Sequence, residues 1–104
     1  MKQNELDKVY EQIETFLKIA GDNTRLRILY SLVEKEMCVC ELQEALAASQ
    51  SLISHQLRVL REGGFVKLRK NGKHRYYSLS DDHVKQLLDV VYEHVIEEKR
   101  EETN

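Results

Sequence analysis

At 104 residues the chain is long enough for one domain with its own core, near the size at which dimerisation often adds stability. Hydrophobic residues make up 41% and charged residues 33%, and there is no proline to interrupt helices. No apolar run approaches the roughly 20 residues of a membrane span, and MKQNELDKVY is not a signal peptide. We therefore expect a cytoplasmic protein without a membrane partner, whose two cysteines are reduced thiols.

The net charge of −2 hides an uneven distribution. Residues 50–75 hold seven Lys and Arg against one acid, so this stretch carries +6 and the remaining residues carry −8. A concentrated basic stretch in a weakly acidic chain is typical of a protein that binds a polyanion such as DNA. A charged face that is merely solvated is the alternative.

The N-terminal half follows a helical pattern. Apolar residues recur at helical spacing over 5–20, and a second helix follows with Asp22 or Asn23 as its N-cap. The chain should then form a short strand near Met37–Val39 and a short helix over 41–47. This half therefore predicts three helices.

The C-terminal half mixes helix and hairpin. Ser49 should cap a helix that ends at Gly63–Gly64. Alternating residues over 65–79, with the turn signal Asn71–Gly72, predict a β-hairpin. A last helix should cover 81–98, with 99–104 frayed. The result is one mainly α domain over residues 1–104, with the order α-α-α-α-β-β-α.

Two short helices, a tight turn at 47–49 and a basic hairpin describe a winged helix-turn-helix, with the helix-turn-helix at 40–63 and the wing at 65–79. Its second helix would enter the major groove of double-stranded DNA. The candidate DNA contacts are Gln50, Ser51, Ser54, His55, Gln56 and Arg58 on that helix, and Arg69, Lys70, Lys73, His74 and Arg75 on the wing. Successive half-sites on DNA require a homodimer, for which helices 5–20 and 81–98 would supply the interface. A protein-binding domain with a charged hairpin is the alternative.

The last helix carries two histidines, each near a carboxylate, on an otherwise apolar face that should be buried. Asp81 precedes His83 by two positions, and Glu97 follows His94 by three. At about 100° per residue the histidines share a face, but at about 1.5 Å per residue they lie roughly 16 Å apart. Metal–ligand bonds are about 2 Å long, so the two histidines of one chain cannot bind the same ion. Each pair is therefore a candidate half of a metal site.

An antiparallel pair of these helices would complete two equivalent sites, each shared between subunits. Two imidazoles and two carboxylates in a tetrahedral arrangement suit Zn(II), or Co(II) as its mimic. Ordinary polar helix positions, with Asp81 as an N-cap, are the alternative.

Four segments together resemble the ArsR/SmtB family of metal-sensing transcriptional repressors, over roughly residues 10–98. They are GDNTRLRILYSL, EMCVCELQEAL, SQSLISHQLRVLREGGFVKLRKNGKHRYYSL and DDHVKQLLDVVYEHVIEE. The resemblance implies a dimeric winged-helix repressor that leaves its operator when metal binds. The family's C-terminal pattern is met in full by Asp81, His83, His94 and Glu97, and is similar to that of its zinc and cobalt sensors.

The resemblance also covers a thiolate motif, which stands here as EMCVCEL with Cys38 and Cys40. In the family this motif serves arsenic, antimony, cadmium or lead. Arsenic sensors usually add a cysteine where Gln43 stands here, and residues 1–20 lack the N-terminal cysteines of cadmium and lead sensors. In a regular helix the two thiols would lie about 200° apart, so only an extended backbone would let both face one ion. Structural thiols, a second soft-metal site and a redox or persulfide switch all stay open.

The leading hypothesis is a homodimeric repressor that binds operator DNA and releases it when Zn(II), or else Co(II) or Cd(II), occupies the C-terminal helix site. The alternative is a repressor on the same scaffold that senses oxidants, persulfides or soft metals (Cd, Pb, As) through Cys38 and Cys40. A small metallohydrolase is a third class. Four protein ligands would leave no place for water, and no nucleophile, base and oxyanion group come together, so we expect no enzyme.

Overall fold

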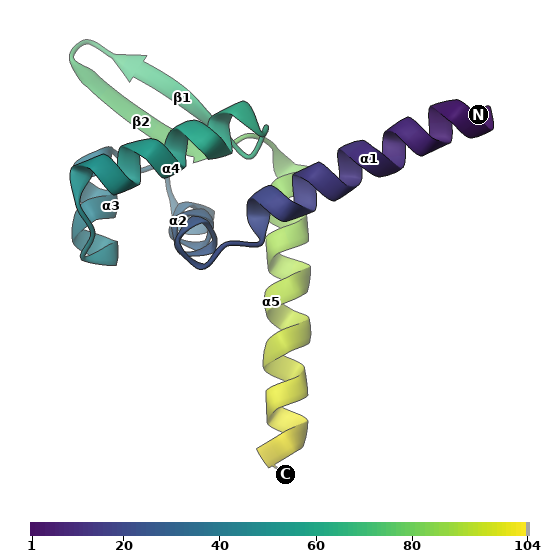
Figure 1. Ribbon diagram of the computed structural model, residues 1–104. Coiled ribbons are helices and arrows are strands. Elements are labelled where there is room, and N and C mark those ends of the chain that lie inside the picture. The colour runs from purple at the N-terminus through teal and green to yellow at the C-terminus, as the bar shows by residue number, and fades with distance from the viewer. Residues whose placement is uncertain (104) are drawn as a thin grey trace.

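The computed structural model describes residues 1–103, with side chains to Glu101, and contains five helices and one hairpin (Figure 1). The elements are α1 (Gln3–Ala20), α2 (Asn23–Glu34), α3 (Val39–Leu46), α4 (Gln50–Glu62), β1 (Val66–Asn71), β2 (His74–Leu79) and α5 (Asp82–Thr103). The order α-α-α-α-β-β-α expected from the sequence is confirmed.

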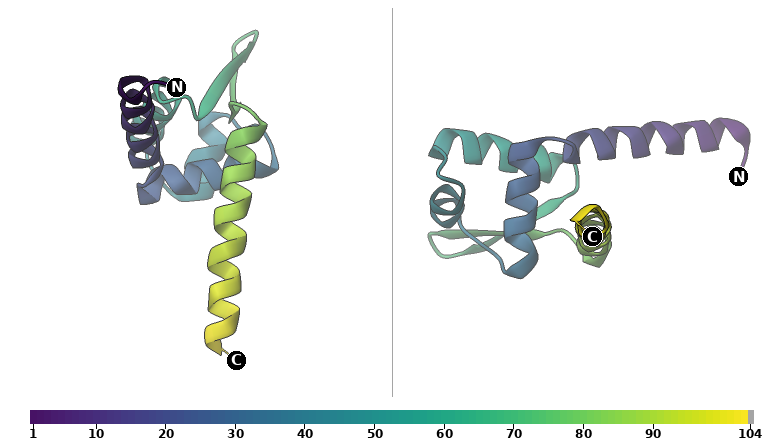
Figure 2. Two further views of the ribbon diagram at one scale, coloured as in Figure 1. Left: turned by 90° about the vertical axis from the view of Figure 1, so that its right-hand side faces the viewer. Right: turned by 90° about the horizontal axis from the view of Figure 1, so that it is seen from below.

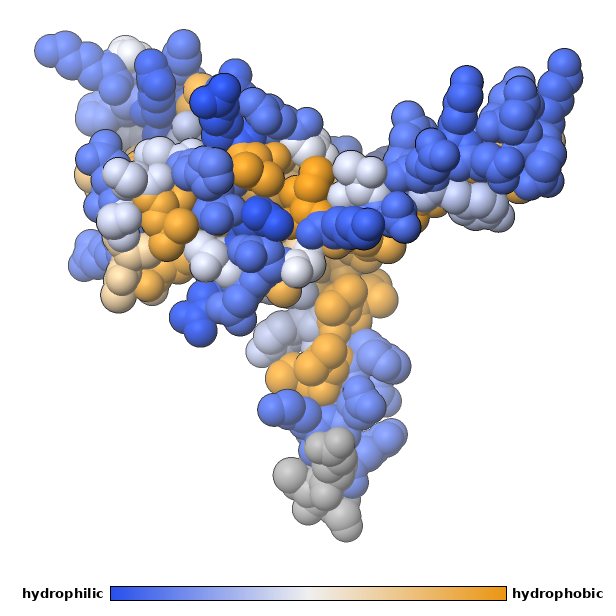
Figure 3. Space-filling model, in the orientation of Figure 1, coloured by the Kyte–Doolittle hydropathy of each residue, from blue (hydrophilic) through white to orange (hydrophobic). Residues whose placement is uncertain are grey.

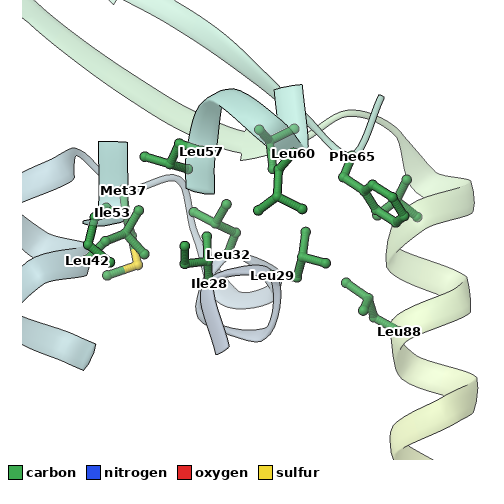
Figure 4. Close-up of a cluster of buried hydrophobic side chains, with 12 residues drawn as sticks. Ile28, Leu29, Leu32, Met37, Leu42, Ile53, Leu57, Leu60, Phe65 and Leu88 are labelled. Atoms are coloured by element: carbon green, nitrogen blue, oxygen red, sulfur yellow. The ribbon is translucent and has the colours of Figure 1, made fainter. Parts of the chain in front are cut away.

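The core lies where α2, α3 and α4 meet the base of the hairpin (Figure 4). It is entirely apolar, and Phe65, just before β1, is its largest fully buried side chain. The other buried members are Ile28, Leu29, Leu32, Met37, Leu42, Ile53, Leu57, Leu60, Val66, Val84 and Leu88. Burial of this set holds the helix-turn-helix against α2 and the hairpin.

The first and last helices project from this body in different directions (Figures 1 and 2). None of the residues of α1 is buried, although Phe16 near its end stacks on Phe65 with ring centroids 3.9 Å apart. The start of α5 is anchored by Val84 and Leu88, which are 4% and 3% exposed. Both helices therefore touch the body at one end and extend beyond it.

Three helix boundaries differ from the expected ones. Helix α1 begins at Gln3 instead of residue 5, and α3 begins at Val39 instead of residue 41 because a capping box at Cys38 starts it early. Helix α5 continues to Thr103, so the expected frayed tail is helical as far as it is described, and Asn104 lies outside the described residues. Strong helix formers in EEKREE carry this extension, with no glycine or proline to stop it.

The hairpin is antiparallel, and Asn71 pairs with His74, so its two-residue turn consists of Gly72 and Lys73. The turn lies one residue later than Asn71–Gly72 as central pair would place it. Gly72 has φ +64°, and glycine in the first central position suits a hairpin turn of the primed kind. The extended segment expected near Met37 is an isolated bridge between Met37 and Tyr77 on the outer edge of β2.

Candidate DNA-binding surface and metal half-sites

The helix-turn-helix consists of α3, the turn at residues 47–49 and α4. Ala47 ends α3 in the left-handed conformation, with φ +52°. The Ser49 hydroxyl then caps α4 by accepting a hydrogen bond from the Leu52 amide at 3.2 Å. Because Ile53, Leu57 and Leu60 are fully buried, the opposite face of α4 is turned to solvent. The turn and cap predicted from the sequence are confirmed.

Five of the six candidate DNA contacts on α4 lie on this exposed face. They are Gln50, Ser51, Ser54, His55 and Arg58. Arg58 also pairs with Glu62 at 3.2 Å, one turn further along. Such an exposed helical pair is weak and leaves the guanidinium available to another anion.

Gln56, the sixth candidate, is half-buried and faces the body instead. Its Oε1 accepts a hydrogen bond from Arg25 Nη1 at 3.1 Å, while Arg25 Nε donates to the Ile19 carbonyl oxygen at 2.6 Å. Arg25 therefore ties the end of α1 and the middle of α4 to α2. Sequence reasoning missed Arg25 because it lies outside the basic stretch, and no local motif marks a contact across 31 residues.

The tip of the hairpin carries Lys70, Lys73, His74 and Arg75, all exposed. Among the described residues, their side chains form no ion pair or hydrogen bond, so the cations Lys70, Lys73 and Arg75 face solvent. Arg69 differs, because it forms a two-point contact with Glu36, Nη2 to Oε1 at 2.6 Å and Nε to Oε2 at 3.2 Å. The wing candidates thus divide into a solvent-facing set at the tip and one engaged arginine.

At the start of α5, Asp81 and His83 lie side by side. One oxygen of Asp81 caps the helix by accepting from the Val84 amide at 3.0 Å, and the other lies 3.9 Å from His83 Nδ1. Their side chains are 56% and 92% exposed. The N-cap role and the pairing with His83 therefore coexist, and a carboxylate oxygen and an imidazole face solvent together.

His94 and Glu97 lie one turn apart further along the helix and are both exposed. The expectation that the histidine face is buried is wrong for the single chain, because the buried stripe through Val84 and Leu88 lies beside it. Within the described part of the chain, no three His, Cys, Asp or Glu side chains gather closely enough to hold a metal ion. One chain thus presents two separate pairs of metal-binding side chains.

The two cysteines lie at the start of α3. Cys38 is half-buried, extended and the N-cap of the helix, whereas Cys40 is exposed and already helical. The Cys38 amide donates to Glu41 Oε1 at 3.2 Å, and this bond is the main reason that the pKa of Glu41 is lowered. The extended backbone that would be needed at both thiols is present only at Cys38.

A search of the described helices for one long and apolar enough to cross a membrane finds none.

Comparison with known proteins gives consistent matches. Residues 22–67, from α2 into β1, match the family described as bacterial regulatory protein, arsR family. The chain is 44% identical to a transcriptional repressor SmtB homolog of Synechocystis over 92 residues, which is 88% of this chain and 69% of that protein. It is 42% identical to a cadmium resistance transcriptional regulatory protein, a CadC homolog of Staphylococcus aureus, over 89% of this chain and 74% of that protein.

Among solved structures, reduced HlyU from Vibrio cholerae superposes with a TM-score of 0.78 at 34% identity, covering 86% of this chain and 94% of that one. The fold, the helix-turn-helix and the relatives all indicate the same family. The chain therefore belongs to the arsR family of bacterial regulatory proteins, and it is a winged helix-turn-helix transcriptional regulator that binds DNA, not an enzyme.

Proposed function

We propose that the protein is a homodimeric repressor that releases its operator when a divalent metal ion, Zn(II) foremost, binds between the two α5 helices. The dimer is inferred from apolar surface that the single chain leaves uncovered. The buried stripe of Val84 and Leu88 continues along α5 as Val91 and Val95, which are 46% and 47% exposed (Figure 3). A second copy of the chain would cover this face.

Helix α1 offers a second such surface. Tyr10, Ile13 and Leu17 are each about half exposed or more, at 58%, 48% and 52%, on a helix that buries no residue in the single chain. Helices α1 and α5 thus both carry exposed apolar side chains that no other element covers within the described residues. This supports a dimer built on α1 and α5 together.

Operator recognition is assigned to the exposed face of α4 and the tip of the hairpin. The amide and hydroxyl groups of Gln50, Ser51 and Ser54 suit base edges or phosphates, and the cations Lys70, Lys73 and Arg75 suit phosphates. Figures 1 and 2 show the α3–α4 pair and the hairpin tip on the side of the body away from the free end of α1. Two such surfaces in a dimer would bind successive half-sites.

The metal assignment rests on one observation: two pairs of metal-binding side chains lie at opposite ends of an exposed helix. Asp81 and His83 form one pair, and His94 with Glu97 the other. Each pair offers one carboxylate and one imidazole, so two pairs from different chains would give the four nitrogen and oxygen ligands that Zn(II) prefers. The relatedness to a cadmium resistance regulator supports a metal effector of some kind.

Metal can weaken DNA binding only by binding better to a dimer geometry that fits the operator poorly. Two contacts offer a physical route from α5 to α4. The Tyr30 hydroxyl on α2 donates to the Leu88 carbonyl oxygen on α5 at 2.8 Å, and Arg25, also on α2, donates to Gln56 on α4. Helix α2 is thus hydrogen-bonded both to α5, which carries the proposed metal ligands, and to α4, which carries the proposed DNA contacts.

The test uses a labelled duplex that the wild-type protein selects from a randomised DNA library. Zn(II) at saturation should weaken binding of this duplex by about tenfold or more. The Glu97→Ala variant should lose most of this response, whereas Glu93→Ala, which removes an exposed acid from the same helix, should keep it. If wild type retains full affinity while zinc saturates it, the proposal of metal-driven release is wrong.

A thiol sensor is the second candidate, because Cys40 is exposed and Cys38 begins the helix-turn-helix. Oxidation of a thiol at this position would alter the start of α3. The Cys38→Ser/Cys40→Ser variant separates the two candidates. It should respond to zinc as wild type does if α5 is the sensor, and it should lose any response to peroxide or persulfide donors.

A further inference from the structure

Arg69 lies on the opposite face of the hairpin from the tip cations Lys70 and Arg75. Side chains alternate along a strand, and directly paired residues share a face. Lys70 and Arg75 are paired in the register and therefore lie on one face, whereas Arg69 is paired with Tyr76 and lies on the other. A phosphate held by Lys70 and Arg75 would thus meet the opposite side of the strand from Arg69.

The Arg69 guanidinium already has an anion and an aromatic ring as partners. Its two bonds to the Glu36 carboxylate, at 2.6 and 3.2 Å, form the fork-to-fork contact that gives arginine its directional strength. Its Cζ also lies 4.9 Å from the centre of the Tyr76 ring. The Glu36 hydrogen bond raises the pKa of Arg69, and the same bond lowers the pKa of Glu36.

Glu36 belongs to the segment that joins α2 to the helix-turn-helix. The next residue, Met37, exchanges two backbone hydrogen bonds with Tyr77 at 2.9 and 2.8 Å, and Cys38 after it caps α3. The side chain of Glu36 reaches beyond β2 to Arg69 on the outer strand β1. The pair therefore links the far strand of the wing to the start of α3.

We infer that the Glu36–Arg69 pair is a clamp that sets the orientation of the wing relative to the helix-turn-helix, so that Arg69 positions the wing and makes no phosphate contact. The inference rests on the proposed contact of the wing with DNA. A two-stranded hairpin is marginally stable by itself, so a modest contact at its flank can decide its orientation. If Arg69 left Glu36 for a phosphate, an unpaired carboxylate would face the DNA and repel it.

The two possible roles of Arg69, a clamp to Glu36 or a phosphate contact, predict opposite effects of Glu36→Gln on DNA affinity. If the pair is a clamp, Glu36→Gln and Arg69→Gln should each weaken binding of the selected duplex by roughly threefold to tenfold, and the double variant should be no weaker than either. The slope of log affinity against log salt should stay at the wild-type value in all three, because no phosphate contact is lost. The measurement is fluorescence anisotropy over a series of KCl concentrations.

The inference is overturned if Glu36→Gln binds DNA as wild type does or more tightly, if the two losses add, or if Arg69→Gln lowers the salt slope by about one per wing. The exchanged pair Glu36→Arg/Arg69→Glu gives a further check. It should recover most of the affinity lost in Arg69→Glu alone if the pair is a clamp, and recover none if position 69 meets a phosphate. Circular dichroism and thermal unfolding establish that each variant is folded.

The neutral variant Lys70→Gln/Lys73→Gln/Arg75→Gln separates this inference from the proposed wing contact. If that variant keeps wild-type affinity and salt slope, the wing does not touch DNA and the proposed function fails at this point. If it loses both while Glu36→Gln has no effect, the wing contact stands and only the clamp fails.

Discussion

The hydroxyl of Tyr30 on α2 donates a hydrogen bond to the carbonyl oxygen of Leu88 on α5, at 2.8 Å across 58 residues of sequence. Burial, and then the charge of Asp89, raises the pKa of the Tyr30 phenol, so it remains a donor at neutral pH. The Tyr30 ring also lies 5.9 Å from that of Tyr92, centroid to centroid. This is the main hydrogen bond between the body and α5 among the described residues.

Tyr30→Phe removes this bond and keeps the ring. We expect the free energy of unfolding to fall by about 1 kcal/mol, the usual net value of one hydrogen bond. Urea unfolding measures it, with Thr15→Val, which removes an exposed hydroxyl on the opposite side of α1 from Ile13 and Leu17, as a control that should change little. If Tyr30 also couples α5 to α2, the variant should bind zinc as wild type does but release less DNA.

Val95→Glu tests the interface proposed for α5. A charge placed in an apolar contact between two helices must be desolvated, so the dimer should weaken by at least about 30-fold, equivalent to roughly 2 kcal/mol. Sedimentation equilibrium gives the mass in solution. Gln86→Glu adds the same charge at an exposed position of α5 outside the apolar stripe and should leave the dimer intact. Equal behaviour of the two variants would contradict the interface.

Ala47→Gly should stabilise the protein. Ala47 holds φ +52°, which is unfavourable for a residue with a Cβ atom and costs glycine little. We expect a gain of about 0.5 to 1 kcal/mol in the free energy of unfolding, since relief of this conformation outweighs the added entropy of the unfolded chain. Ala45→Gly, inside α3, should instead destabilise by a similar amount. A loss in both variants would show that the turn is not strained at Ala47.

Two carboxylates make stability sensitive to acid. The Arg69 hydrogen bond lowers the pKa of Glu36, and the Cys38 amide lowers that of Glu41, both from an ordinary value of 4.5. A folded pKa below the unfolded one stabilises fully above pH 4.5, and this contribution is lost as pH falls through the lowered value. Urea midpoints measured from about pH 6 to about pH 3 should therefore drop less steeply for Glu36→Gln/Glu41→Gln than for wild type. The pair Glu11→Gln/Glu93→Gln is the control and should follow wild type.

Local signals in the sequence account for most of the fold. The caps at Asp22 and Ser49 and the helix end at Gly63 each depend on a few neighbouring residues, and each is found where the pattern predicts it. The Asn71–Gly72 signal predicts the hairpin turn one residue too early, because Asn71–Gly72 and Gly72–Lys73 are both acceptable central pairs. The pairing of the whole strands decides between them.

Contacts between distant polar residues could not be predicted in this way. Arg25 donates a hydrogen bond to Gln56, 31 residues away in sequence, and Arg69 donates to Glu36, 33 residues away. No apolar periodicity predicts either contact. Each pair engages one residue, Gln56 or Arg69, that the sequence pattern predicts to contact DNA. The two pairs on α5 could be predicted from local sequence. The spacing of His83 and His94 shows that one chain cannot bring both to the same ion, and it therefore predicts a site shared between subunits.

The most direct test of the central claim is complementation between two defective chains. Asp81→Ala/His83→Ala removes the pair at the start of α5, and His94→Ala/Glu97→Ala removes the pair further along, so neither homodimer should bind zinc at α5. If each site is shared between subunits, the mixed dimer, isolated with two different affinity tags, contains one intact site. It should therefore bind one zinc ion and recover part of the zinc-driven release of DNA. A mixed dimer that binds no more zinc than its parents would contradict the shared site.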